Sequence, residues 1–186
     1  PAAGISHLKK FGFDSQRLPH DLSLALGSAS VTPVEVATGY SIIANGGHRI
    51  HSHYISKIVE STSGELVYQA QPVAVCHDCE EKAALTPSDE KPPHPDNSSP
   101  IAQRVVSKQN IYLLTHMMMD VVKRGTARRA RSLGRNDLAG KTGTTNEARD
   151  AWFNGFNSNI VATAWVGFDQ ARSLGNRETG GRSALP

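Results

Sequence analysis

This sequence has few cysteines, no long apolar run and little net charge. Each of these features argues against a class of protein. Cys76 and Cys79 are the only cysteines among 186 residues, too few for a disulfide scaffold or a four-cysteine zinc site. No run approaches the roughly 20 apolar residues of a membrane span, and no charged region followed by an apolar core marks a secretory signal. We therefore expect any membrane anchor or address signal to lie outside this chain.

Charge is nearly balanced along the chain. The 20 basic and 17 acidic residues give a net charge of +3, which permits an anionic partner without requiring one. The densest basic stretch, residues 123–135, could bind nucleic acid or an anionic membrane surface. It has no interleaved aromatic residue and matches no helix-turn-helix or RNA-binding signature, and basic residues at a helix C-terminus also favour the helix dipole. The sequence therefore predicts no nucleic-acid partner.

The two cysteines stand close together, separated by His77 and Asp78, with His94 further along the same polar stretch. They could form a tight disulfide, remain free thiols or supply half a metal site. A structural zinc ion needs four well-placed ligands. A Cys76–Cys79 disulfide therefore ranks above a metal site, and we expect no metal.

Helical signals appear in three places in a chain long enough for one domain with a buried core. Residues 5–11 have helical apolar spacing, with a stop at Gly12. A second helix should start at Thr32, because Pro33 and Glu35 follow at the first and third helical positions, and should end at residues 45–47. Helical spacing returns over residues 107–124, with Gly125 as its C-terminal cap.

Strand signals complete the predicted fold. Residues 54–60 and 65–71 predict a hairpin, and residues 137–144, 150–156 and 160–168 predict an antiparallel meander. The last two runs are almost wholly apolar, as in strands covered on both faces, so Trp152 and Trp165 are expected in the core. Residues 72–102 are rich in proline and polar residues, which predicts a surface insertion. Helices on an antiparallel sheet make an α+β domain.

The chemical signal is the tripeptide Lys141-Thr142-Gly143, which ends the first of the three predicted strands. Lys-Thr-Gly is one of the three signatures of the serine penicillin-recognising enzymes, together with Ser-x-x-Lys and Ser-x-Asn or Ser-Asp-Asn. A bare tripeptide is weak evidence. Here a β-prone run precedes it and two apolar strands follow it, which is the setting that the signature requires.

The surrounding segments strengthen this interpretation, because they resemble class A penicillin-binding proteins, most closely the 1A type of Gram-negative bacteria. The resemblance covers nearly all of the chain apart from the polar insertion. The segments that carry it are residues 24–28, 32–33, 44–47, 125–127, 140–146, 150–155, 165–167 and 180–186. It implies a penicillin-binding, serine β-lactamase-like fold in which an antiparallel sheet is flanked by helices.

The resemblance assigns roles to the residues of the motif. A peptide ending in D-Ala-D-Ala would lie antiparallel to the strand, with the backbone N–H of Thr144 as one arm of the oxyanion hole. Lys141 and Thr144 are therefore the expected catalytic residues. Thr142, Gly143, Thr144 and Thr145 are the expected substrate-binding residues, since the threonine hydroxyls suit a terminal carboxylate and Gly143 allows close approach.

The polar turn after the motif is expected to support the site from a distance. Asn146 and Asp150 would stand behind the substrate-binding residues, although a solvated surface turn is the simpler interpretation of both.

Two of the three signatures are missing. No Ser-x-Asn occurs in the chain, and the two Ser-x-x-Lys matches, at Ser6 and Ser88, stand in contexts that do not suit a nucleophile. We therefore expect residues 1–186 to be the C-terminal part of a transpeptidase domain that is incomplete at both ends. This part alone is expected to be inactive, because the serine that attacks the substrate lies outside it.

The implied activity is that of a peptidoglycan D,D-transpeptidase, which cross-links stem peptides through a serine ester, needs no cofactor and is acylated by β-lactams. The parent would also carry a glycosyltransferase domain, and a membrane anchor would hold it on the periplasmic side of the inner membrane. A D,D-carboxypeptidase and a catalytically dead penicillin-binding module are the alternatives. A β-lactamase is disfavoured by the context of residues 150–153.

Overall fold

The computed structural model describes residues 1–76 and 100–185. Most of the predicted insertion at 72–102, including Cys79, Ser88 and His94, therefore lies outside the described residues. The two described ends of that stretch lie side by side. Ala74 and Ile101 form a parallel β-bridge, in which Ala74 N donates to Pro100 O at 2.9 Å and Ala102 N donates to Ala74 O at 2.8 Å.

The predicted meander is confirmed. Strands β3 (Ala139–Thr144), β4 (Ala151–Phe156) and β5 (Val161–Val166) form an antiparallel sheet in the order β3-β4-β5. Side chains alternate between the faces of a strand, so Lys141 and its cross-strand neighbour Asn154 share one face. Thr142 and its neighbour Phe153 occupy the other.

The predicted helices are present. They are α1 (Ala2–Lys10), α2 (Pro33–Ala44) and α4 (Lys108–Arg124). The capping box of α2 is complete, since the Thr32 hydroxyl accepts from Glu35 N at 3.3 Å and the Glu35 carboxylate accepts from Thr32 N at 2.7 Å. Ser107 caps α4, and Gly125 follows its last residue.

Short helical turns were not predicted from the sequence. Three 3₁₀ segments, η1 (Leu22–Leu26), η2 (Arg128–Leu133) and η3 (Asn146–Ala148), and a π-helical turn, η4 (Gly180–Ala184), connect or end the larger elements.

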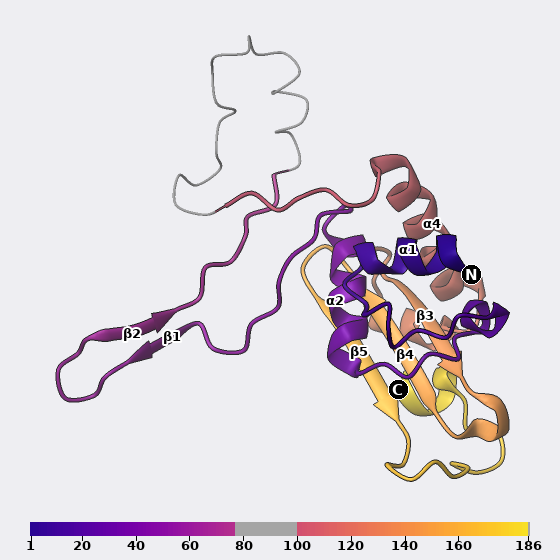
Figure 1. Ribbon diagram of the computed structural model, residues 1–186. Coiled ribbons are helices and arrows are strands. Elements are labelled where there is room, and N and C mark those ends of the chain that lie inside the picture. Colours follow the sequence, from indigo (N-terminus) through magenta and orange to yellow (C-terminus); the bar gives the residue numbers. More distant parts are fainter. Residues whose placement is uncertain (77–99, 186) are drawn as a thin grey trace.

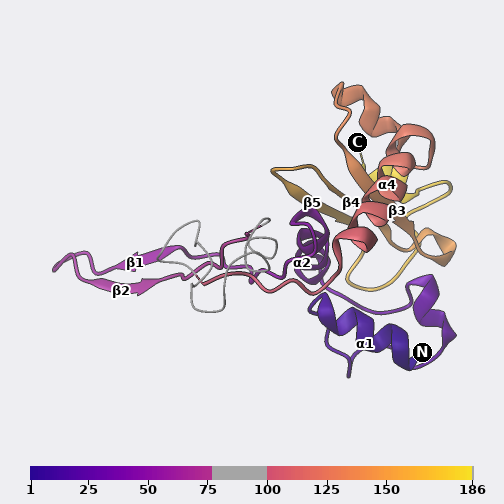
Figure 2. The ribbon, with the colours of Figure 1, turned by 90° about the horizontal axis from the view of Figure 1, so that it is seen from above.

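Helices cover both faces of the sheet (Figure 2). On the Lys141 face, Ile42 and Ile43 of α2 pack with Ala139 and Phe156, and Met118 of α4 joins them. On the Thr142 face a second cluster joins Val122, Ala127, Ala130, Leu138, Phe153 and Leu185. A fully buried aliphatic side chain stabilises the folded state by about 1.5–3 kcal/mol, so these clusters fix the sheet against its helices.

The hairpin is also confirmed, although it is shorter than predicted. Strands β1 (Lys57–Val59) and β2 (Leu66–Gln69) are antiparallel, and they project away from the rest of the chain (Figure 1). Both strands are exposed along their whole length. The hairpin therefore contributes nothing to the core among the described residues.

The prediction that both tryptophans lie in the core is wrong for Trp165. Its side chain is 37% exposed, because β5 is the edge strand of the described sheet and the face that carries Trp165 is covered only in part. Trp152, on the central strand, is partly buried. The two rings lie next to each other, with centroids 6.1 Å apart.

We expect Thr32→Ala to destabilise the start of α2 by about 1 kcal/mol at neutral pH, because it removes the side-chain cap. Faster amide hydrogen exchange over residues 33–38 would show this, with Ser30→Ala as the matched control. The backbone hydrogen bond from Thr32 lowers the pKa of Glu35 below its ordinary value of 4.5. The Thr32 hydroxyl also donates to the Glu35 carboxylate, at 2.9 Å, and lowers the same pKa to a smaller extent. Thr32→Ala keeps the backbone bond and removes the hydroxyl bond, so the part of the difference that depends on the ionised carboxylate should be lost as the pH falls below 4.5. Equal exchange at pH 7 would contradict this role of Thr32.

Candidate functional site

The outer edge of β3 presents alternate backbone groups to its surroundings. Thr145 N donates to Asp150 O at 3.1 Å, so the backbone of Thr145 faces β4. In an antiparallel ladder every second residue faces the same neighbour. The N–H groups of Gly143 and Lys141 therefore also point toward β4. The N–H and C=O groups of Thr142 and Thr144 therefore point away from β4. Among the described residues no further strand pairs with this edge.

Lys141 stands at this edge with its side chain exposed. Its ammonium Nζ donates to the carbonyl oxygen of Thr142 at 2.7 Å, one of the groups that the ladder directs outward. A positive charge therefore lies beside the outward-facing backbone groups of the strand.

Three threonine hydroxyl groups, those of Thr126, Thr142 and Thr144, lie beside the same edge. The Oγ1 atoms of Thr142 and Thr126 are 2.6 Å apart, and Thr144 Oγ1 accepts from Gly180 N at 3.0 Å. A hydroxyl has one hydrogen to donate. The Thr126–Thr142 pair therefore keeps one free hydrogen and Thr144 keeps its own, so two O–H groups remain for an anionic ligand.

Access to these hydroxyls differs. Thr142 is buried, with 8% of its surface exposed, whereas Thr126 and Thr144 are exposed. A ligand that approaches the edge would reach Thr144 and Thr126 more readily than Thr142.

The segment around Gly180 packs directly on the sheet behind the motif. A Cβ atom on Gly180 would lie 2.2 Å from Trp152 O and 2.3 Å from Gly143 O, and one on Gly181 would lie 2.6 Å from Thr126 O. Only glycine allows this approach of two backbones. The C-terminal turn η4 therefore supports β3 at Gly143.

The turn between β3 and β4 is closed by Thr145 and Asp150. Thr145 Oγ1 donates to Asp150 Oδ2 at 3.2 Å and accepts from Asp150 N at 2.8 Å, while Trp165 Nε1 donates to Asp150 Oδ1 at 3.0 Å. The hydroxyl of Thr145 is thus engaged within the turn. Asn146 begins η3 and is exposed.

A polar row crosses the Lys141 face of the sheet. Asn154 lies between Lys141 and Thr163 in the strand register, and Tyr40 of α2 forms a side-chain hydrogen bond with it. Burial raises the pKa of Tyr40 to about 12, with the hydrogen bond from Asn154 acting in the opposite direction. Within the described part of the chain, the Asn154 Oδ1 and Thr163 Oγ1 atoms are buried and have no hydrogen-bond partner.

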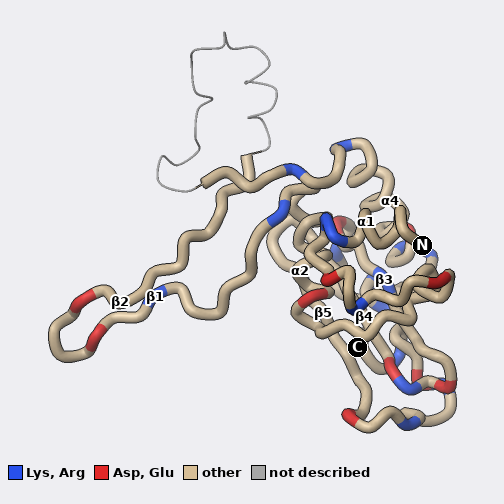
Figure 3. The backbone as a smooth tube through the Cα atoms, in the orientation of Figure 1, with Lys and Arg blue, Asp and Glu red and all other residues tan. Residues whose placement is uncertain are grey.

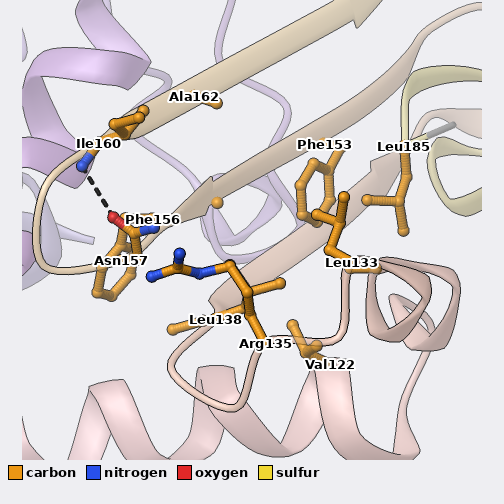
Figure 4. Close-up of a pocket in the computed structure, with 13 residues that line it drawn as sticks. Val122, Leu133, Arg135, Leu138, Phe153, Phe156, Asn157, Ile160, Ala162 and Leu185 are labelled. Carbon is orange, nitrogen blue, oxygen red and sulfur yellow. Dashed lines mark hydrogen bonds between the residues drawn. The ribbon is translucent and has the colours of Figure 1, made fainter.

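An apolar pocket of about 330 Å³ lies at the opposite end of the sheet (Figure 4). It is bordered by Ala139, where β3 begins, and by Phe156 and Asn157, where β4 ends. Arg135 is the charged residue of its lining, and it is held by Asp137 at 2.9 Å. This pocket has no polar group suited to acyl transfer, and we do not assign the chemistry to it.

The structure brings Lys141, Thr142, Gly143 and Thr144 together on one strand edge, with Thr145 and Asp150 in the adjoining turn. Their individual roles stay predictions. Sequence reasoning missed Thr126 and Gly180 as neighbours of the motif. Both lie in segments that carry the resemblance, but their contacts join residues 16 and 36 positions apart.

The other sequence predictions concern the cysteines and the basic stretch. Cys76 is disulfide-bonded, and Cys79 lies outside the described residues. Residues 1–76 and 100–185 contain no group of three side chains that could hold a metal ion. No helix in the same ranges has the length and apolarity of a membrane span.

Several basic residues of 123–135 have partners or lie at a helix end, and Lys and Arg lie in many parts of the described chain (Figure 3). Arg124 pairs with Asp120, and Arg135 donates to Asp137. Lys123 and Arg124 occupy the last turn of α4, where positive charge favours the helix dipole.

Comparisons with known proteins point to one family. The penicillin binding protein transpeptidase domain family matches residues 8–175. Penicillin-binding protein 1A of Pseudomonas aeruginosa is 43% identical over 98% of this chain, and its counterpart in Neisseria meningitidis serogroup B is 41% identical over 97%. The crystal structure of penicillin-binding protein 1A from Haemophilus influenzae superposes with a TM-score of 0.79, at 33% identity over 95% of this chain. This chain spans 25%, 20% and 28% of those three proteins.

We expect Gly180→Ala to destabilise the described unit by about 3 kcal/mol, because the added methyl group overlaps two backbone carbonyls that cannot move independently. The midpoint of thermal unfolding would report the loss. Gly4→Ala is the matched control, since a Cβ atom there meets nothing within 4 Å. Equal midpoints for the two variants would show that η4 does not pack on Gly143.

Proposed function

The chain belongs to the penicillin-binding protein transpeptidase domain family, and from this premise we propose that it forms the substrate-aligning part of a peptidoglycan D,D-transpeptidase. The proposed enzyme joins stem peptides by acyl transfer. A serine ester forms with loss of the terminal D-alanine, and an amine of a second stem peptide then takes the acyl group. β-Lactams would acylate the same serine.

The outward-facing edge of β3 carries this proposal. An extended peptide can add to an exposed strand edge through main-chain hydrogen bonds, and Thr142 and Thr144 offer the required N–H and C=O groups. A stem peptide ending in D-Ala-D-Ala would lie antiparallel to β3. Gly143 keeps the strand free of a side chain between these two residues.

Charge stabilisation is the main contribution of this edge. In acyl transfer the carbonyl oxygen of the substrate becomes negative, and a fixed N–H donor at that position lowers the barrier by about 3 kcal/mol. Thr144 N–H is the proposed donor. The free hydroxyl hydrogens of Thr144 and of the Thr126–Thr142 pair would bind the terminal carboxylate, and the Lys141 ammonium would attract it.

The nucleophile is proposed to lie outside residues 1–186. A serine hydroxyl needs an adjacent base, and the described serine of a Ser-x-x-Lys match, Ser6, is an exposed residue of α1. Ser88 lies outside the described residues. Neither serine is therefore assigned the chemistry.

The longer protein is proposed to be a class A enzyme that also carries a glycosyltransferase domain and acts on the periplasmic side of the inner membrane. The similarity to penicillin-binding proteins 1A supports this assignment. The disulfide at Cys76 is compatible with an oxidising compartment.

Incubation with a fluorescent penicillin tests the location of the nucleophile. We expect no covalent label on residues 1–186 alone, and a label on the longer protein at a serine upstream of residue 1, identified by mass spectrometry. Competition with unlabelled penicillin is the control. An adduct at Ser6 or Ser88 would contradict our placement of the nucleophile.

A second test concerns the carboxylate. In the longer protein, Thr144→Val keeps the backbone N–H but removes the hydroxyl that would bind the carboxylate. A hydrogen bond to a charged group contributes about 1.5–3 kcal/mol of interaction free energy. We expect the second-order rate constant of acylation by penicillin to fall at least about tenfold. Thr163→Val, which removes a hydroxyl with no partner on the opposite face, should stay within about twofold of wild type. Equal rates for the two variants would remove Thr144 Oγ1 from the site.

A further inference from the structure

The turn that follows Thr144 is held in an unusual backbone conformation. Glu147 and Ala148 have φ angles of 60° and 50°, in a region that residues other than glycine seldom adopt. Such a conformation persists only where the surrounding structure imposes it. The contacts of this turn therefore show what determines its shape.

The first set of contacts comes from a segment that follows β5. Ser173 Oγ donates to Glu147 O at 2.8 Å, and Leu174 N donates to Ala148 O at 2.8 Å. Both left-handed residues thus have their carbonyl groups bound by the same short segment. Arg149 Nε also donates to the Glu147 carboxylate at 3.0 Å.

The second set passes through the two carboxylate oxygens of Asp150. Oδ2 accepts from the Thr145 hydroxyl at 3.2 Å, and Oδ1 accepts from the Trp165 indole N–H at 3.0 Å. Trp165 belongs to β5, two strands away from β3. The residue next to Thr144 is therefore tied to the far strand of the sheet through one side chain.

We propose that Trp165 is a positioning residue that acts through Asp150 and Thr145 to fix the direction of the Thr144 N–H. This inference rests on the proposed function, because it assigns that N–H to the oxyanion. The peptide unit that Thr144 shares with Thr145 carries the Thr144 carbonyl, so the bonds of Thr145 fix the C-terminal side of Thr144 and restrain the residue that bears the N–H. Ser173 supports the same turn through its hydrogen bond to Glu147 O.

Trp165 lies partly at the surface. Its side chain is 37% exposed, and its indole N–H donates to Asp150. Trp152 is the adjacent indole on the same face. Among the described residues its side chain makes no hydrogen bond to the turn, so a variant of Trp152 separates the effect of ring packing from the effect of the hydrogen bond.

The test uses the longer protein and single-turnover acylation by a fluorescent penicillin at several concentrations, which separates affinity from the acylation rate constant. A small misplacement of a reacting group can slow a reaction by up to about 100-fold. We expect Trp165→Phe to lower the acylation rate constant about tenfold and to leave the affinity within about twofold, because the indole does not contact the ligand. Trp152→Phe should leave both parameters within about twofold.

Ser173→Ala provides a second variant that leaves the tryptophans intact. It should also lower the acylation rate constant without changing the affinity, and the thermal midpoints of all variants are measured alongside. Wild-type rate constants for Trp165→Phe, or equal losses for the two tryptophan variants, would overturn the positioning role. If the wild-type longer protein takes up no penicillin, the proposed function itself fails and the positioning role falls with it.

Discussion

The antiparallel pairing of β3 with β4 is the constraint on which the site depends. It engages the backbone groups of Lys141 and Gly143 and leaves those of Thr142 and Thr144 directed outward. One register therefore decides which N–H can meet a substrate. A shift by one residue would exchange the two sets and turn every side chain to the other face.

The rest of the described chain holds that register from both faces. Ile42 and Ile43 of α2 pack against the Lys141 face, while η4 approaches so closely that only glycine fits at residue 180. The same turn donates to the Thr144 hydroxyl. Thr144, the proposed oxyanion donor, is thus also a point at which the C-terminal turn contacts the strand.

The sequence predicted the local features well because they depend on neighbours in the chain. The capping box at Thr32, the apolar face of α4 and the meander all follow from short-range patterns. The exposed position of Trp165 did not, because an apolar run cannot show whether its strand lies in the centre or at the edge of a sheet. The Thr126–Thr142 contact could not be predicted from the sequence, because it forms only when the fold brings the end of α4 beside β3.

The central claim is that the Thr144 N–H on the free edge of β3 binds the oxyanion. A crystal structure of the longer protein acylated by a penicillin tests it directly. The account predicts the ester carbonyl oxygen about 2.7–3.1 Å from Thr144 N, with the ligand extended along β3 and its carboxylate near the Thr144 hydroxyl. An ester oxygen bound by other donors, with Thr144 N directed elsewhere, would contradict it.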